Sequence, residues 1–414
     1  MGRARFGFLT LACLAFCLGG PRSVVAADWA MLDPWQETVA REQFQKSLDD
    51  VYCPSGALTN YLEFTNSAVR VFSTTNHQGA PLYELQFGNG RRTHWVAPAF
   101  KTIDDVHQLH NPTNMPLRGL RIVLDPGHIG GEWARMEERF FQLNKHDRPV
   151  QEAVLNLRVA RLLKPQLEAA GATVLLTKND FQPVTSSRPD DFYVEARQTV
   201  MQNREFDSWP ELDREAGIAD AICKRQELLF YRSAEIAARA RLVNEKLKPD
   251  LTVCIHFNAV DWNEHFDLVD DNRLVVFVHG NYLPNEVADD DQKLRLFRKV
   301  LEGSHTVELA AAESVAQALG EATKLPAVDY GKGPGAIRCG ANPFVYARNL
   351  AANRLVDGPV IFLEPYYQNN RIVYQRIQQG DYEGTSEIEG HPYPSIFKEY
   401  ADAVAKGLIG FYSR

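Results

Sequence analysis

From Leu120 onward, the hydrophobic pattern alternates between two kinds of segment. Short runs that are apolar on both faces are followed by longer segments whose apolar residues recur at helical spacing. The runs predicted as strands are 121–125, 172–177, 251–257, 274–280 and 358–364. The helices predicted between and after them are 150–171, 234–247, 306–320 and 395–412. This alternation predicts an α/β fold with a mostly parallel sheet and helices on both faces.

The preceding residues, 28–115, predict a small α+β N-terminal domain. A helical pattern over 35–52 is followed by three short strand-like runs, the first two joined by a tight turn at Asn66 and Ser67. We find no chemical motif in this unit, so a packing or wall-docking module is its simplest interpretation. The larger domain is predicted to span 116–414.

A polar stretch at about 185–232 interrupts the alternation of strands and helices. It lies between a predicted strand and the helix that should follow it, and its pattern is mostly helical. Insertions of this length in such positions are often lids or binding elements. A lid and a passive surface excursion are both open at this point.

The first residues predict a signal peptide at 1–27. Arg3 and Arg5 precede a short apolar run, and small residues around Ala26 offer a cleavage site. The run is too short for a membrane span, so we expect an exported protein of the periplasm or cell envelope. The formal net charge of −8 and the lack of a basic tract argue against a nucleic-acid partner.

Acidic or metal-binding side chains follow three of the predicted strands. The first strand leads to Asp125 and His128, the third to His256, and the last to Glu364. Ligands bind at the carboxyl ends of the strands in open parallel sheets, so these side chains should meet at one edge. Two imidazoles, one carboxylate and an open position make a hydrolytic zinc site. Glu152 is the candidate third ligand, although an acid at the start of a helix also stabilises the helix dipole.

Three further residues near these strand ends have a predicted role. Gly127 has one interpretation, and Asp125 and Asn258 have two each. Gly127 is expected to turn the chain towards His128 because glycine tolerates unusual dihedral angles. Asp125 either orients a ligand or caps the turn. Asn258 either hydrogen-bonds substrate or serves as a turn residue.

The four motifs "IVLDPGHIGG", "QEAVLNLRVARLL", "RARLVN…DLTVCIHFNA" and "PVIFLEPYYQNN" resemble the zinc-dependent N-acetylmuramoyl-L-alanine amidases of the bacterial cell wall. Their order and most spacings match over residues 120–410. The resemblance implies that His128, Glu152 and His256 bind Zn²⁺ and that Glu364 is the catalytic glutamate. It also implies peptidoglycan or muropeptides as substrate, cut between the muramyl lactyl group and L-alanine. A protein activator is possible and unidentified.

The sequence departs from the family at several positions. Cys254 replaces a common serine, Tyr366 and Tyr367 replace Gly-Phe, and part of 132–150 is extra along with the 185–232 insertion. Two alternative functions stay open. One is another zinc peptidase or carboxypeptidase, for which Arg348 is the nearest candidate to bind a terminal carboxylate. The other is an inactive wall-binding protein, which a missing ligand would favour.

Overall fold

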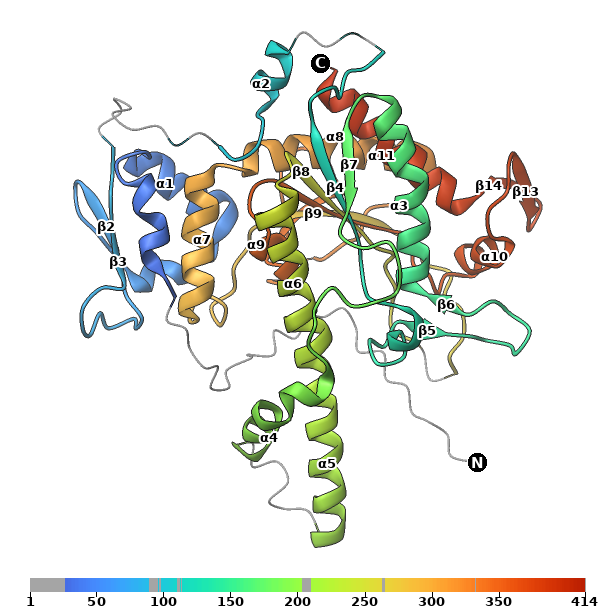
Figure 1. The fold of residues 1–414 in the computed structure, drawn as a ribbon, viewed down its shortest axis with the longest axis horizontal. Helices are drawn as coiled ribbons and strands as arrows, with labels where there is room; N and C mark the ends of the chain where they lie inside the picture. Colours follow the sequence, from blue (N-terminus) through green and yellow to red (C-terminus); the bar gives the residue numbers. More distant parts are fainter. Residues whose placement is uncertain are drawn as a thin grey trace.

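A seven-stranded sheet forms the centre of the larger part of the molecule (Figure 1). The computed structural model describes residues 27–88, 96, 98–109, 112, 114–202, 210–262, 265–331 and 333–413. The sheet has the order β10-β11-β9-β12-β8-β4-β7. Its strands are β4 (Arg121–Pro126), β7 (Thr173–Leu176), β8 (Leu251–Ile255), β9 (Leu274–His279), β10 (Ile337–Arg338), β11 (Val345–Arg348) and β12 (Val360–Pro365).

Strand directions confirm the predicted mostly parallel sheet. The neighbours β7, β4, β8 and β12 are mutually parallel. Beyond them β9 pairs with β12 in the antiparallel sense, and β11 runs parallel to β9. The carboxyl ends of β4, β8 and β12 therefore lie at the same edge of the sheet.

Helices cover both faces of this sheet, as predicted. One face packs against α3 (Glu152–Ala169), α8 (His305–Thr323) and α11 (Ile396–Tyr412). The other face packs against α6 (Glu235–Arg241), its continuation to Leu247, and α9 (Ala351–Leu355). β8 and β9 are buried along their whole length between the two layers, which explains their nearly continuous apolar runs.

The N-terminal residues form a smaller antiparallel sheet of β1 (Leu62–Phe64), β2 (Ala68–Val71) and β3 (Tyr83–Gln86), next to α1 (Arg41–Ser47). The predicted hairpin is present, with Leu62 opposite Val71. The core of this unit includes Phe297 and other residues of α7 (Asp290–Glu302), so it packs on the larger part. The predicted domain boundaries stay predictions, and the signal peptide prediction lies almost entirely outside the described residues.

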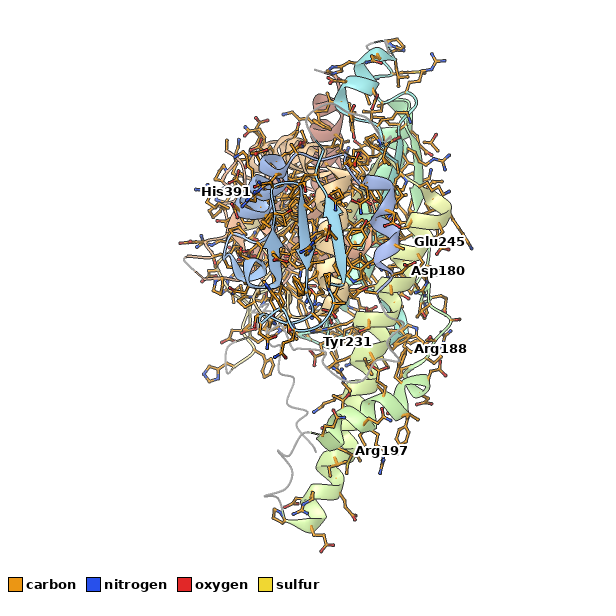
Figure 2. The ribbon with its side chains drawn as sticks, turned by 90° about the vertical axis from the view of Figure 1, so that its left-hand side faces the viewer. Asp180, Arg188, Arg197, Tyr231, Glu245 and His391 are labelled. Carbon is orange, nitrogen blue, oxygen red and sulfur yellow. The ribbon has the colours of Figure 1, made fainter. Side chains whose placement is uncertain are left out.

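The insertion forms a helical arm that projects from the body of the molecule (Figures 1 and 2). It contains α4 (Tyr193–Gln202) and α5 (Glu211–Leu228), which pack against each other. A π-helical segment, Leu229–Ala234, joins α5 directly to α6. Figure 2 shows Arg197 on the projecting arm and Tyr231 near its base.

The remaining elements are short or peripheral. They are α2 (Ile103–Gln108), β5 (Phe140–Phe141), β6 (Val150–Gln151), α10 (Arg371–Gln379), β13 (Thr385–Ile388) and β14 (His391–Pro394). Among the described residues, no helix has both the length and the apolar character that crossing a membrane would require.

Candidate metal centre

His128, Glu152 and His256 meet at the edge of the sheet where β4 and β8 end. Nε2 of His128 lies 3.1 Å from Oε1 of Glu152, and Nδ1 of His256 lies 3.0 Å from the same oxygen. One donor atom from each residue lies within 4.8 Å of the other two. A search of the described residues for three or more His, Cys, Asp or Glu side chains close enough to share a metal ion finds this group.

Local backbone structure brings each of the three side chains to this point. His128 follows β4 in the left-handed conformation, with φ of 64°. His256 follows β8, and its ring stacks on Phe362 with centroids 4.2 Å apart. Glu152 is the first residue of α3 and is buried. The expected turn is present, but the positive φ belongs to His128 and not to Gly127, so the dihedral explanation given for Gly127 is wrong.

The charges of the three groups depend on one another. Burial alone would raise the pKa of Glu152, but His128 and His256 hold that pKa well below its ordinary value. Burial lowers the pKa of His256, and the neighbouring His128 contributes to this shift. For His128 burial acts in the same direction, but Glu152 and Glu137 outweigh it and raise the pKa. The site therefore holds an ionised carboxylate between two imidazoles, as a cation would require.

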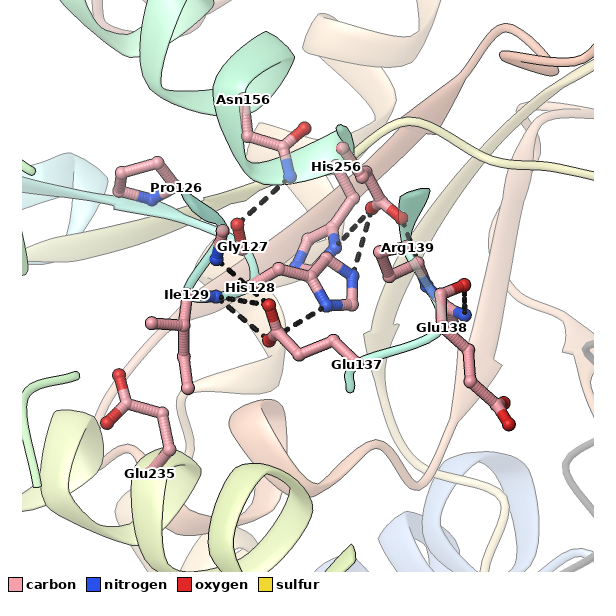
Figure 3. A network of polar contacts seen from close by, with 12 residues as sticks. Pro126, Gly127, His128, Ile129, Glu137, Glu138, Arg139, Asn156, Glu235 and His256 are labelled. Carbon is pink, nitrogen blue, oxygen red and sulfur yellow. Dashed lines mark hydrogen bonds and ion pairs between the residues drawn. The ribbon is translucent and has the colours of Figure 1, made fainter. Parts of the chain in front are cut away.

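Glu137 contacts the same centre and was not identified from the sequence. Its Oε1 lies 3.5 Å from Nδ1 of His128, on the ring edge away from Glu152 (Figure 3). It also accepts hydrogen bonds from the backbone N–H groups of Ile129, at 2.8 Å, and Gly130, at 2.9 Å. Burial opposes ionisation of Glu137, but these donors and His128 keep its pKa below the ordinary value.

Glu364 ends β12 beside the three-residue cluster. Its side chain is 6% exposed, and Oε2 has no hydrogen-bond partner among the described residues. Burial, together with the negative charge of Glu152, raises the pKa of Glu364 to about 7. A buried carboxylate without a partner is costly unless a cation or solvent compensates it. Its place fits a group that accepts a proton rather than a permanently paired structural acid.

Asp125 lies beneath the cluster and has no direct contact with the three residues in the described hydrogen bonds. It accepts from Thr177 Oγ1 and from Nη1 of Arg239, the latter at 3.1 Å. Arg239 in turn donates to the carbonyl oxygen of Pro126 at 2.9 Å and to that of His128 at 2.7 Å. Asp125 is therefore linked to the His128 turn through Arg239, and its role in orienting a ligand stays a prediction.

None of the described hydrogen bonds joins Asn258 or Arg348 to the three clustered residues. The side chain of Asn258 accepts from the N–H of Ala259 at 2.8 Å, the contact of a turn residue. Arg348 lies on β11 with its guanidinium 5.6 Å from the Phe277 ring centroid. It is 5% exposed, and its positive charge acts on Glu364. Cys254 is buried, and all four cysteines in the described residues are free.

No protein-family model matches the chain. A probable cell wall amidase, LytH of Staphylococcus saprophyticus, is 34% identical over 102 residues. The match covers 25% of this chain and 32% of that protein, so it spans about a third of the relative's length.

Similar solved structures include three amidases. N-acetylmuramyl-L-alanine amidase Ami1 from Mycobacterium smegmatis has a TM-score of 0.38 and 13% identity, covering 72% of this chain and 98% of its own. Amidase AmiC2 of Nostoc punctiforme has a TM-score of 0.35 and 16% identity, and the match covers 71% of this chain and 98% of that chain. The CwlD amidase from Clostridioides difficile, in complex with the GerS lipoprotein, has a TM-score of 0.37 and 14% identity. That match covers 71% of this chain and 99% of the CwlD chain. The 102-residue match to a probable cell wall amidase agrees with the resemblance that the four sequence motifs carry.

Proposed function

We propose that this protein is a zinc-dependent hydrolase that cleaves the amide bond between N-acetylmuramic acid and L-alanine in peptidoglycan. The observation that supports this most directly is the cluster of His128, Glu152 and His256 near Glu364, whose buried Oε2 has no hydrogen-bond partner among the described residues. Three protein ligands with an open fourth position are typical of catalytic zinc, whereas four ligands are typical of structural zinc.

The residues of the cluster fit a zinc ion. Two imidazole nitrogens and one carboxylate oxygen are a known hydrolytic donor set. Ligands about 2.1 Å from a tetrahedral ion lie roughly 3.5 Å from each other, which the donor atoms of this cluster can reach by small movements. The unpartnered Oε2 of Glu364 also fits a site that is completed by a cation and a water molecule.

In this mechanism the clustered residues would hold the zinc ion, and Glu364 moves a proton. A zinc ion bound here would supply Lewis acidity, polarising the substrate carbonyl and lowering the pKa of a bound water towards ~7. Glu364 accepts the proton of the attacking water at its free carboxylate oxygen. The same carboxyl group then donates that proton to the leaving amine nitrogen of L-alanine. Glu152, held by two imidazoles and Arg139, keeps its charge throughout.

The substrate assignment is supported by resemblance rather than by the site itself. The matched relative is described as a probable cell wall amidase, and the motifs around all four residues resemble that family. Export to the periplasm or cell envelope, predicted from the leader, would bring the enzyme to peptidoglycan. A protein activator remains a prediction.

Zinc analysis combined with product analysis on purified peptidoglycan tests this proposal. We expect one zinc per chain, sharply lower occupancy in His256→Ala, and release of stem peptides with free L-alanine amino termini from intact glycan strands. Release of single C-terminal amino acids would indicate a carboxypeptidase instead. Binding to the wall without any product would indicate an inactive wall-binding protein, and full zinc in His256→Ala would refute the ligand assignment.

A further inference from the structure

The segment 137–139 contacts two of the three candidate ligands at once. Glu137 reaches His128 and Arg139 reaches Glu152, while Glu138 between them is exposed. We propose that Glu137 and Arg139 are positioning residues that hold these two ligands in the geometry needed to bind metal. This inference rests on the zinc site of the proposed function and assigns it a supporting element from a stretch that lies outside the family motifs.

Glu137 fixes both the ring and the backbone of the His128 turn. An N–H at Nδ1 of His128 facing this carboxylate leaves the lone pair at Nε2, the nitrogen that lies 3.1 Å from Glu152. The two backbone N–H groups held by Glu137 directly follow His128, whose left-handed conformation needs external support. Because Glu137 is only 2% exposed, water does not compete for these contacts.

Arg139 divides the two oxygens of Glu152 between different partners. Its Nε lies 3.1 Å from Oε2, while both imidazoles contact Oε1. The carbonyl oxygen of Arg139 also accepts a hydrogen bond from the N–H of Glu152 at 3.3 Å. Gln368 adds a weaker contact to Oε2, at 3.4 Å. These contacts leave Oε1 directed to the metal position.

The conformation of Glu138 explains how two residues so close in sequence reach different ligands. Glu138 has a φ of 56°, a left-handed conformation that turns the chain between its neighbours. The turn is closed by the N–H of Arg139, which donates to the carbonyl oxygen of Ala134 at 2.9 Å. Residues 137–139 therefore form one hydrogen-bonded turn that contacts both the His128 loop and the start of α3.

Zinc affinity of Glu137→Gln, measured by chelator competition, tests the proposal against Glu138→Gln as a matched control. A glutamine at 137 must turn its NH2 group towards one of the N–H donors now bound by the carboxylate. We expect zinc binding to weaken roughly 10- to 100-fold, the usual effect of losing such a partner, and to be unchanged in Glu138→Gln. Arg139→Met should also weaken binding, and Arg139→Lys should restore part of it. In the ¹⁵N spectrum of the metal-free protein, the His128 tautomer should change in Glu137→Gln alone.

The outcomes separate this inference from the proposed function. A wild-type protein that binds no zinc would refute the metal hydrolase itself. A wild type that binds zinc, with Glu137→Gln and Glu138→Gln equal to it, would overturn the positioning role and leave the hydrolase standing. If Glu137→Gln does not fold by circular dichroism, Arg139→Met decides the question, because its side chain is 18% exposed and less critical for packing. Unchanged zinc affinity in that variant would then overturn the proposal.

Discussion

The ring of His256 lies directly against the backbone of Gly127. A Cβ atom at position 127 would be 2.0 Å from Cε1 and 2.3 Å from Nε2 of that ring. A backbone hydrogen bond joins the ends of β4 and β8 at this point, since the N–H of Gly127 donates to the carbonyl oxygen of Ile255 at 3.0 Å. Glycine is therefore required at position 127 by the close approach of the His256 ring, and not by the dihedral angles of the turn.

Gly127→Ala should displace His256 and weaken zinc binding by at least about tenfold, because the ring is packed between Gly127 and Phe362. Overpacking should also lower the free energy of unfolding by about 1–3 kcal/mol. Zinc titration and chemical denaturation measure the two effects. Gly335→Ala is the control, because a Cβ there meets nothing within 4 Å. Equal zinc affinity in both variants would contradict the packing argument.

Glu364→Gln should separate catalysis from metal binding. Glutamine keeps the size of the side chain but cannot accept the water proton, so turnover should fall by roughly two to four orders of magnitude. Zinc content and binding of wall fragments should be retained, because Glu364 is not among the three clustered donors. The exposed Glu387→Gln serves as control. Loss of zinc in Glu364→Gln would make Glu364 a ligand and reopen the role of Glu152.

The titration of Glu364 should also appear in the stability of the zinc-free protein. Burial raises its pKa from 4.5 to about 7, so between these values the folded protein holds a proton that the unfolded chain has lost. Stability from this group therefore falls as pH rises through that window, by roughly 3 kcal/mol in total. Glu364→Gln has no carboxyl group to titrate at this position. From pH 4.5 to 7.5, the free energy of unfolding of wild type should therefore fall relative to that of Glu364→Gln.

Denaturation curves at several pH values measure this difference. Parallel pH profiles of wild type and Glu364→Gln would show that the carboxyl group titrates normally. Added zinc should reduce the effect, because a nearby cation favours the ionised carboxylate and lowers its pKa.

The sequence predicts the parts of the fold that depend on local pattern. The runs before Asp125, His256 and Glu364 are apolar on both faces, so their strands and their shared edge follow from periodicity and connection rules. The reversed direction of β9 and β11 does not follow, because an apolar run such as 274–280 has no direction of its own. The described residues between β8 and β9 contain no helix, so the chain returns along the sheet without the crossover that parallel neighbours need.

The supporting contacts of the site were harder to predict than its centre. Glu137 and Glu138 are adjacent and chemically identical, and nothing in "RMEERF" tells which one is buried. Their difference arises from the left-handed turn at Glu138 and from closure of the loop on His128. Arg239 was noted only as part of a helix motif, because its contacts with Pro126 and His128 join residues more than a hundred positions apart.

The base of the helical arm packs on the loop that carries His128, which predicts an effect of the arm on the metal site. Phe230 is fully buried against Ile129 and lies 5.1 Å from the Trp133 ring centroid. Leu229, its neighbour, belongs instead to the core of the arm itself. Phe230→Ala should remove the support under Ile129, lower the free energy of unfolding by roughly 3–5 kcal/mol, and weaken zinc binding. Leu229→Ala should destabilise the arm and leave zinc affinity unchanged, since Leu229 belongs to a hydrophobic cluster that does not include Ile129. Equal zinc affinities in two folded variants would show that the arm is independent of the metal centre.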